Sequence, residues 1–341
     1  MPANSSSDSS LQSTPWGYTS SRGAFRHTRK QLTRKQRLFG ERVMEKLVFA
    51  AGVSSVLIIA LIFVFLFKEA LLFFRTGTPL DLIGKWVTDP WEEKTIFNML
   101  WQPVSEIPKY SFIPLFCGSF LVSFPATILA ALIGVGCAVY LSEIAPPRAR
   151  EILKPSIELL AGIPSVVLGF IMLAVLASFI QDVLHTKFRL NAFVGALGVA
   201  LATLPVIITI SEDSLRAVPK ELKNASYALG ATKWQTIFNT TIPAAISGIS
   251  AGIILGFGRA LGETMIVLMA TGNAALITGN IFSSVRTMTA TLAAELGEVA
   301  QGDEHYYALF LVGAVLFTFT FALNLISEII LNKTRQRLRM S

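Results

Sequence analysis

The chain has 341 residues, of which 52% are hydrophobic and only 15% are charged. Soluble domains usually carry about 25% charged residues, so this composition excludes an ordinary soluble protein and indicates a chain that lies mostly in lipid. The net charge of +7 does not indicate nucleic-acid binding, because 20 of the 29 lysines and arginines fall in four short polar stretches beside apolar runs. Basic residues in such positions are signals of membrane topology.

The first 40 residues are rich in serine and then in basic residues, and they contain no apolar core typical of a signal peptide. We expect residues 1–46 to form a basic cytoplasmic tail that sets the topology, with binding to anionic membrane lipid as the alternative. A second basic cytoplasmic tail is expected at residues 332–341.

Six apolar runs between these tails are long enough to cross about 30 Å of hydrocarbon. They cover residues 47–67, 112–141, 157–180, 192–210, 242–271 and 307–331. If the N-terminus is cytoplasmic, all four basic stretches lie on the inner side. The positive-inside rule therefore predicts an all-α polytopic membrane protein with about six transmembrane helices within residues 47–331, and with both termini in the cytoplasm.

A polar segment from Glu212 to Pro243 separates the fourth and fifth runs. It is too polar to span the membrane and too long for a tight turn. Its middle favours a helix that Gly230 ends or kinks, and a second short helical turn is expected from Ala231. Such a helix–glycine–helix element on the cytoplasmic face would offer a surface to a soluble partner, and an ordinary interfacial helix is the alternative.

The fifth run carries small residues on one face. Gly248, Gly252 and Gly256 are spaced by four, which allows helix backbones to approach closely in lipid. If the helix is continuous, Gly252, Gly256, Arg259 and Glu263 fall within a stripe roughly 60° wide, at about 100° per residue. We therefore expect these glycines to serve helix packing.

Arg259 and Glu263 are charges in the middle of this run, where charge is costly and usually faces a bundle interior or a water-filled path. Arginine binds tetrahedral oxyanions with matched donors, so Arg259 suits the path of an anion. A carboxylate paired with it would keep the anion from being trapped. The alternative is a structural ion pair that only fixes the packing of the helix.

Two stretches resemble known transport proteins. The polar segment resembles the cytoplasmic coupling loop of ABC importer permeases, which reads EAA, three residues, Gly, nine residues, I-x-LP. Asn224 stands where that pattern has Glu, and Thr240 stands where it has Ile. In that family the loop docks into the ATPase subunit and transmits its closure. The resemblance assigns this role to Asn224, Ala225, Ser226, Gly230, Ala231, Trp234 and Pro243.

The octapeptide GRALGETM, residues 258–265, resembles the hallmark of the C-type permease subunit of the phosphate-specific (Pst) ABC importer. The stretches at 140–146, 161–167, 286–289 and 304–309 agree with that family in type and order. The likeness covers about residues 110–335. It implies a type I ABC importer permease fold in a bacterial plasma (inner) membrane. It also implies import of inorganic phosphate with a second similar permease in a heterodimer, two ATP-binding subunits and an extracytoplasmic phosphate-binding protein.

Two further polar residues enter through this resemblance. Ser119 follows Gly118 at the start of the second run, where the family has a Gly-Thr or Gly-Ser pair near the outer mouth. Its hydroxyl is a candidate donor to an oxyanion, although serine in a span more often bonds a backbone carbonyl. Arg286 either draws anions in or pairs with Glu295 or Glu298. The candidate substrate path comprises Arg259, Glu263, Thr264 and Ser119.

The remaining classes of function find little support. The sequence has no GxxxxGK[ST] loop, so the chain is not expected to bind ATP itself, and no spacing of cofactor or metal ligands is found. The histidines, His27, His185 and His305, lie outside the predicted spans, which argues against an intramembrane enzyme. A passive channel would not explain the coupling loop. A permease for another oxyanion, such as sulfate or molybdate, is the alternative among transporters.

Overall fold

The computed structural model describes residues 34–88 and 95–340, so the prediction of a tail over residues 1–46 falls mostly outside the described residues. The chain divides into two units, residues 1–59 and 60–341. The described part of the first unit belongs to one helix, α1 (Arg34–Thr76), which continues into the second unit. Apolar side chains of this part, such as Leu47 and Val56, are exposed, which suits a helix surrounded by lipid.

The second unit is built mainly of helices. After α1 they are α2 (Ile113–Val139), α3 (Pro147–Ala161), α4 (Ser165–Ile171), α5 (Ala177–Leu184), α6 (Ala192–Arg216), α7 (Lys220–Ala228), α8 (Lys233–Thr236), α9 (Ile242–Leu261), α10 (Met265–Ala270), α11 (Met288–Glu295) and α12 (Glu304–Met340). Short π-helical turns extend three of them, at Tyr140–Ile144, Met172–Leu176 and Ile237–Thr241.

Two small antiparallel hairpins lie in the loop that precedes α2. Strand β1 (Lys85–Thr88) pairs with β2 (Thr95–Asn98), with Lys85 opposite Asn98. Strand β3 (Trp101–Gln102) pairs with β4 (Lys109–Tyr110), with Trp101 opposite Tyr110. A short 3-10 turn, Pro79–Leu82, stands between α1 and these strands.

Six helices in the described part of the chain are long and apolar enough to cross a membrane, which confirms the predicted number. They cover Val43–Arg75, Ile113–Ile144, Ser165–Leu184, Ala192–Arg216, Lys233–Leu261 and Glu304–Asn332. The first and last of these helices include residues that the sequence analysis placed in the basic tails, since α1 begins at Arg34 and α12 continues to Met340.

The predicted limits of the third and fifth spans were wrong. The third begins at Ser165 and not at 157, because α3 is a separate helix that ends before Gly162 and Pro164. Proline lacks an N–H and disfavours helical backbone at the residue before it, so the chain turns there. The fifth span ends at Leu261, and the apolar residues beyond Gly262 form the separate short helix α10.

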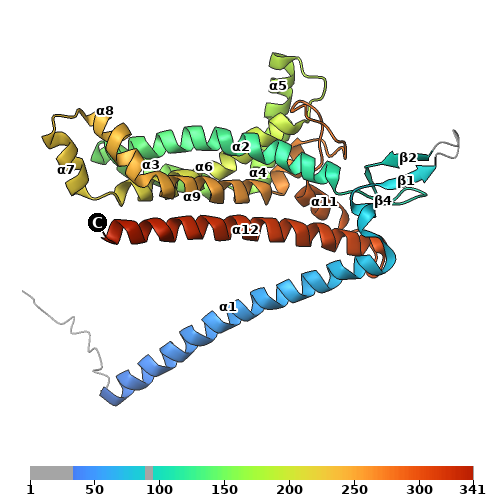
Figure 1. Ribbon diagram of the computed structural model, residues 1–341, viewed down its shortest axis with the longest axis horizontal. Coiled ribbons are helices and arrows are strands. Elements are labelled where there is room, and N and C mark those ends of the chain that lie inside the picture. Colours follow the sequence, from blue (N-terminus) through green and yellow to red (C-terminus); the bar gives the residue numbers. More distant parts are fainter. Residues whose placement is uncertain (1–33, 89–94, 341) are drawn as a thin grey trace, which may run out of the picture. The chain divides into compact units, whose positions relative to one another are not determined.

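Helix α6 lies at the centre of the second unit, packed against α2 and α9, and α12 packs against α9 (Figure 1). Glycines allow this close packing. A Cβ on Gly256 of α9 or on Gly134 of α2 would press on Ile207 of α6, and a Cβ on Gly248 or Gly252 of α9 would press on other side chains of α6. The predicted small-residue face of the fifth span is therefore the face that meets α6.

The two ends of this bundle differ. Helices α7 and α8 lie together at one end, and α11 with the small strands lies at the other (Figure 1). The first end carries the polar segment that separates α6 from α9, and the second carries the long loops before α2 and before α12.

Candidate functional site

The fifth span breaks where the sequence predicted a continuous helix. Helix α9 ends at Leu261, and the N–H of Gly262 donates to the carbonyl of Gly258 at 3.1 Å. Glu263 lies beyond that helix end, and its carboxylate accepts a hydrogen bond from the N–H of Thr264 at 3.2 Å. The expectation that Arg259 and Glu263 share a helical face and pair was wrong for this reason. Among the described residues, no ion pair joins them.

A cleft of about 350 Å³ opens beside this break. Arg259 and Glu263 line it together with Gly262 and with Ala202 of α6. The other lining residues come from the end of α3, the turn after it and the start of α4, namely Leu160, Ala161, Ile163, Ser165 and Leu168. Two stretches that the sequence analysis singled out separately, residues 161–167 and 258–265, therefore meet at one cavity.

The guanidinium of Arg259 is held by a hydrogen bond from one of its three nitrogens. Its Nε donates to the backbone carbonyl of Ala202 at 3.3 Å, and the side chain is otherwise exposed toward the cleft. Within the part of the chain that the structure describes, no carboxylate pairs with it. The two terminal nitrogens of the guanidinium are thus available to an anion, and a guanidinium binds an oxyanion best through such paired donors.

Ser119 lies elsewhere, buried where α2 meets the loop before α11. Its hydroxyl donates to the carbonyl of Leu115 at 2.8 Å and accepts the N–H of Met288 at 3.0 Å. A Cβ on Gly118 would overlap the carbonyl oxygen of Arg286. In this structure the Gly118–Ser119 pair seats the outer segment on α2, and Ser119 does not line the cleft of Arg259.

The polar segment between α6 and α9 forms two helices around a glycine. Helix α7 ends at Ala228, and Gly230 follows with a φ of +84°. The N–H of Gly230 donates to the carbonyl of Tyr227, and the N–H of Ala231 donates to that of Ser226, which is the double hydrogen bond of a Schellman motif. The structure has the predicted helix–glycine–helix element, with α8 as its second helix.

Hydrogen bonds also fix the start of α8. Thr232 accepts the N–H of Gln235, and the side chain of Gln235 accepts the N–H of Thr232, so a capping box begins the helix. The hydroxyls of Ser226 and Thr236 lie 3.0 Å apart and join the two helices. The element is therefore a preformed unit.

This element exposes a set of large apolar side chains. Leu229 is 90% exposed, and Trp234 and Phe238 stack on each other with their ring centroids 6.0 Å apart while remaining exposed. Asn224 and Ala225 lie exposed on α7, and Pro243 lies exposed in the first turn of α9. Exposed apolar residues gathered in this way are typical of a docking surface.

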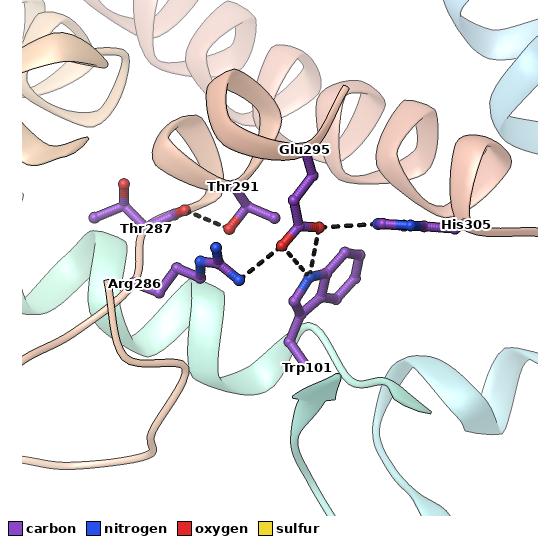
Figure 2. Close-up of polar contacts among 6 residues, drawn as sticks. All are labelled: Trp101, Arg286, Thr287, Thr291, Glu295 and His305. Carbon is purple, nitrogen blue, oxygen red and sulfur yellow. Dashed lines mark hydrogen bonds and ion pairs between the residues drawn. The ribbon is translucent and has the colours of Figure 1, made fainter. Parts of the chain in front are cut away.

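At the opposite end of the bundle, Glu295 joins three separate segments, as Figure 2 shows. Its carboxylate accepts the indole N–H of Trp101 at 3.0 Å, pairs with Arg286 at 2.7 Å and lies 2.9 Å from Nε2 of His305. Arg286 therefore pairs with Glu295, which was one of its two expected roles. Burial raises the pKa of Glu295, but the hydrogen bonds from His305 and Trp101 and the charge of Arg286 outweigh burial and lower it.

Comparison with known proteins identifies the family. Residues 130–339 match the family described as "binding-protein-dependent transport system inner membrane component". This match covers more than half of the chain. The chain belongs to this family of membrane permeases.

Individual relatives of the permease agree with this family. The probable ABC transporter permease protein YqgH of Bacillus subtilis is 37% identical over 224 residues, which cover 66% of this chain and 72% of that protein. The phosphate transport system permease protein PstC of Mesorhizobium japonicum is 33% identical over 256 residues, covering 70% and 77%. PstC of Xylella fastidiosa is 32% identical over 254 residues, covering 69% and 77%.

Similarity to solved structures shows the fold of the permease. A chain of a bacterial alginate ABC transporter in complex with an alginate-bound periplasmic protein has a TM-score of 0.53 at 12% identity, and the likeness covers 89% of this chain and 98% of that chain. A chain of a bacterial ABC transporter for import of alginate has a TM-score of 0.50 at 14% identity, covering 89% and 99%. The permease has the predicted type I ABC importer permease fold.

Two ion-pair sites of the permease near the helix–glycine–helix element were not predicted from the sequence. Lys223 of α7 lies 2.7 Å from Glu143, which follows α2 in the stretch 140–146. Glu212 of α6, only 2% exposed, pairs with Lys154 of α3 at 3.1 Å and with Arg216 at 2.9 Å. The spacing of four between Glu212 and Arg216 was a detectable signal for that pair, whereas the other partners lie far apart in sequence.

Proposed function

We propose that this permease conducts inorganic phosphate across a bacterial plasma (inner) membrane as one subunit of an ATP-driven importer, with both of its termini in the cytoplasm. The observation that carries the proposal is the cleft that presents Arg259. Its guanidinium has terminal donors without a carboxylate partner among the described residues, and it sits where two permease motifs meet. The relatives named PstC supply the choice of phosphate among oxyanions.

The charge of Arg259 has a physical role in such a path. Phosphate carries one to two negative charges and meets a large desolvation barrier in surroundings of low dielectric constant. A fixed guanidinium at the wall of the cleft offsets that barrier. Glu263 lines the same cleft without pairing with Arg259. The negative charge of its carboxylate therefore weakens the binding of an anion at Arg259 and favours release. Thr264, whose hydroxyl donates to the carbonyl of Gly262, directly follows Glu263 but does not line the cleft.

The helix–glycine–helix element supplies the coupling. Its exposed surface, which includes Leu229 and Trp234, would dock on a separate ATPase subunit, since the chain has no ATP-binding loop of its own. The complete importer would hold a second similar permease in a heterodimer, two ATP-binding subunits and an extracytoplasmic phosphate-binding protein. The placement of the basic residues supports cytoplasmic termini.

The test replaces Arg259 in the assembled importer. We expect Arg259→Gln to abolish phosphate uptake into proteoliposomes while the yield of the complex stays at the wild-type level. Lys68→Gln is the matched control, because Lys68 is a cation of the first span whose side chain is 69% exposed. Its uptake should be unchanged.

A second variant separates a path from a structural pair. The charge swap Arg259→Glu with Glu263→Arg should not restore uptake, because the two residues do not form an ion pair that the swap could rebuild. Wild-type uptake by Arg259→Gln, or restored uptake in the swap, would refute the role assigned to Arg259.

A further inference from the structure

A four-residue segment, Arg286–Thr289, connects the outer end of the bundle with the break in the fifth span. Arg286 is tied to Glu295, and the N–H of Met288 is tied to Ser119 of α2. At its other end, the hydroxyl of Thr289 donates to the backbone carbonyl of Glu263 at 2.7 Å. The segment is therefore anchored on the bundle and in turn holds the peptide that follows α9.

The hydroxyls of this segment form a chain of hydrogen bonds with one fixed direction. The N–H of Ala290 donates to Thr287 at 3.2 Å, and the hydroxyl oxygens of Thr287 and Thr289 lie 3.1 Å apart. An amide N–H only donates and a carbonyl only accepts, so the proton of Thr289 goes to Glu263. Thr287 must then donate to Thr289. The relay runs from the first turn of α11 to the carbonyl of Glu263.

Burial makes this relay effective as a fixed support. Thr287 and Thr289 are 3% and 5% exposed, so water does not replace their hydrogen bonds. Hydrogen bonds in series polarise one another, and an unpaired polar group in such a place is costly. The carbonyl of Glu263 needs such a partner because it lies beyond the end of α9, where intrahelical donors are lacking.

We propose that Thr287 and Thr289 are positioning residues for transport, an inference that rests on the function proposed above. Their relay holds the Glu263 peptide, and through it the end of α9, at the wall of the cleft that Arg259 lines. The relay also links the cleft to the outer segment, so a movement of Arg286–Thr289 displaces Glu263. Neither threonine touches the substrate, and each acts through the backbone of Glu263.

The experiment compares two threonines of the same helix. Thr289→Val keeps the shape of the side chain and removes the hydroxyl that holds Glu263. Thr291→Val is the matched control. Among the described residues, the buried hydroxyl of Thr291 bonds only to the carbonyl of Thr287, which also accepts the N–H of Thr291. Thr289→Ser restores the hydroxyl without the methyl group. Phosphate uptake is measured per assembled complex, at increasing concentrations of phosphate-loaded binding protein.

Thr289→Val should lower the maximal uptake rate about tenfold and leave the half-saturating concentration of the loaded binding protein unchanged. Thr289→Ser and Thr291→Val should transport at close to the wild-type rate. A wild-type rate in Thr289→Val, equal losses in Thr289→Val and Thr291→Val, or failure of Thr289→Val alone to assemble would overturn the positioning role. If the wild-type complex itself imported no phosphate, the function proposed above would fail instead.

Discussion

The end of helix α9 between Arg259 and Glu263 prevents the ion pair that their spacing suggests. Their spacing of four suggests an ion pair on one face, but the helix ends between them at Leu261. Arg259 keeps its terminal donors toward the cleft, while the carboxylate of Glu263 caps the N–H of Thr264. Residues of the motif therefore line the cleft, and the charges of Arg259 and Glu263 do not pair with each other.

Gly230 is the residue at which the backbone itself constrains the coupling element. Nothing lies within 4 Å of a Cβ built there, so space does not exclude a side chain. Its φ of +84° does, because left-handed backbone costs about 1–2 kcal/mol for residues other than glycine, asparagine and aspartate. This free energy is too small to unfold the whole protein, but it is large enough to change the conformation of one turn.

We therefore expect Gly230→Val to leave the complex assembled but to separate ATP hydrolysis from phosphate uptake, because a β-branched residue resists the left-handed turn. Gly230→Asn is the control, since asparagine adopts this conformation readily. The measurement is phosphate imported per ATP hydrolysed in proteoliposomes. Normal coupling in Gly230→Val would show that the shape of this turn does not matter to the ATPase contact.

At the scale of elements, the proposed coupling element is tied to more than its flanking helices. The pair between Lys223 and Glu143 joins α7 to the end of the second span, with side chains only 19% and 11% exposed. A force on α7 is thus transmitted to α2 as well as to α9. Ion pairs in such positions resist separation more than surface pairs do.

Lys223→Met should reduce the phosphate imported per ATP by roughly twofold to tenfold, which corresponds to a coupling energy of about 0.4–1.4 kcal/mol. The charge swap of Lys223→Glu with Glu143→Lys should recover most of the loss. Lys220→Met serves as the control, because Lys220 lies exposed on the same helix and its side chain has no hydrogen bond or ion pair within the described residues. An equal loss in both single variants would assign the effect to general charge on α7.

The outer cluster around Glu295 predicts a dependence of stability on pH. The pKa of Glu295 in the fold lies below its ordinary value of 4.5. An acid with a lowered pKa stabilises the fold above its unfolded pKa, and this stabilisation is lost as the pH falls through the lowered value. The melting temperature of the complex should therefore drop as the pH falls below about 4.5.

Glu295→Gln should flatten this acid dependence, and Glu298→Gln should preserve it. Glu298 and Glu295 line one cavity at this end of the bundle, but the side chain of Glu298 has no hydrogen bond or ion pair among the described residues. Thermal unfolding followed by tryptophan fluorescence provides the measurement. An unchanged acid slope in Glu295→Gln would mean that other carboxylates cause the loss.

The elements differ in how far the sequence could predict them. Apolar length and basic flanks predicted the number of spans, and Gly230 marked the end of α7 because left-handed turns select glycine. The break after Leu261 was missed, because the apolar residues of α10 continue the run without a proline. The contacts of Glu295 with Trp101 and His305 could not be predicted either, since they join segments that are distant in sequence.

At the scale of the whole molecule, the permease presents surfaces that require partners. The cleft of Arg259 is open on the isolated chain, and α2 exposes an apolar stripe spaced by four, formed by Phe124, Ile128 and Leu132. Such a stripe suits lipid or a second permease. The exposed apolar side chains of the coupling element suit an ATPase. Under the function proposed above, a second permease and an ATPase subunit would cover these surfaces.

We expect this chain to import phosphate only as the permease of an ATP-driven complex. The most direct measurement is uptake of radiolabelled phosphate into proteoliposomes, with the chain alone and with the chain assembled with its second permease, ATPase subunits and binding protein. We expect uptake only in the assembled complex and only with ATP, and we expect excess sulfate or molybdate not to compete. Phosphate uptake by the chain alone, uptake without ATP, or competition by sulfate equal to that by phosphate would contradict the account.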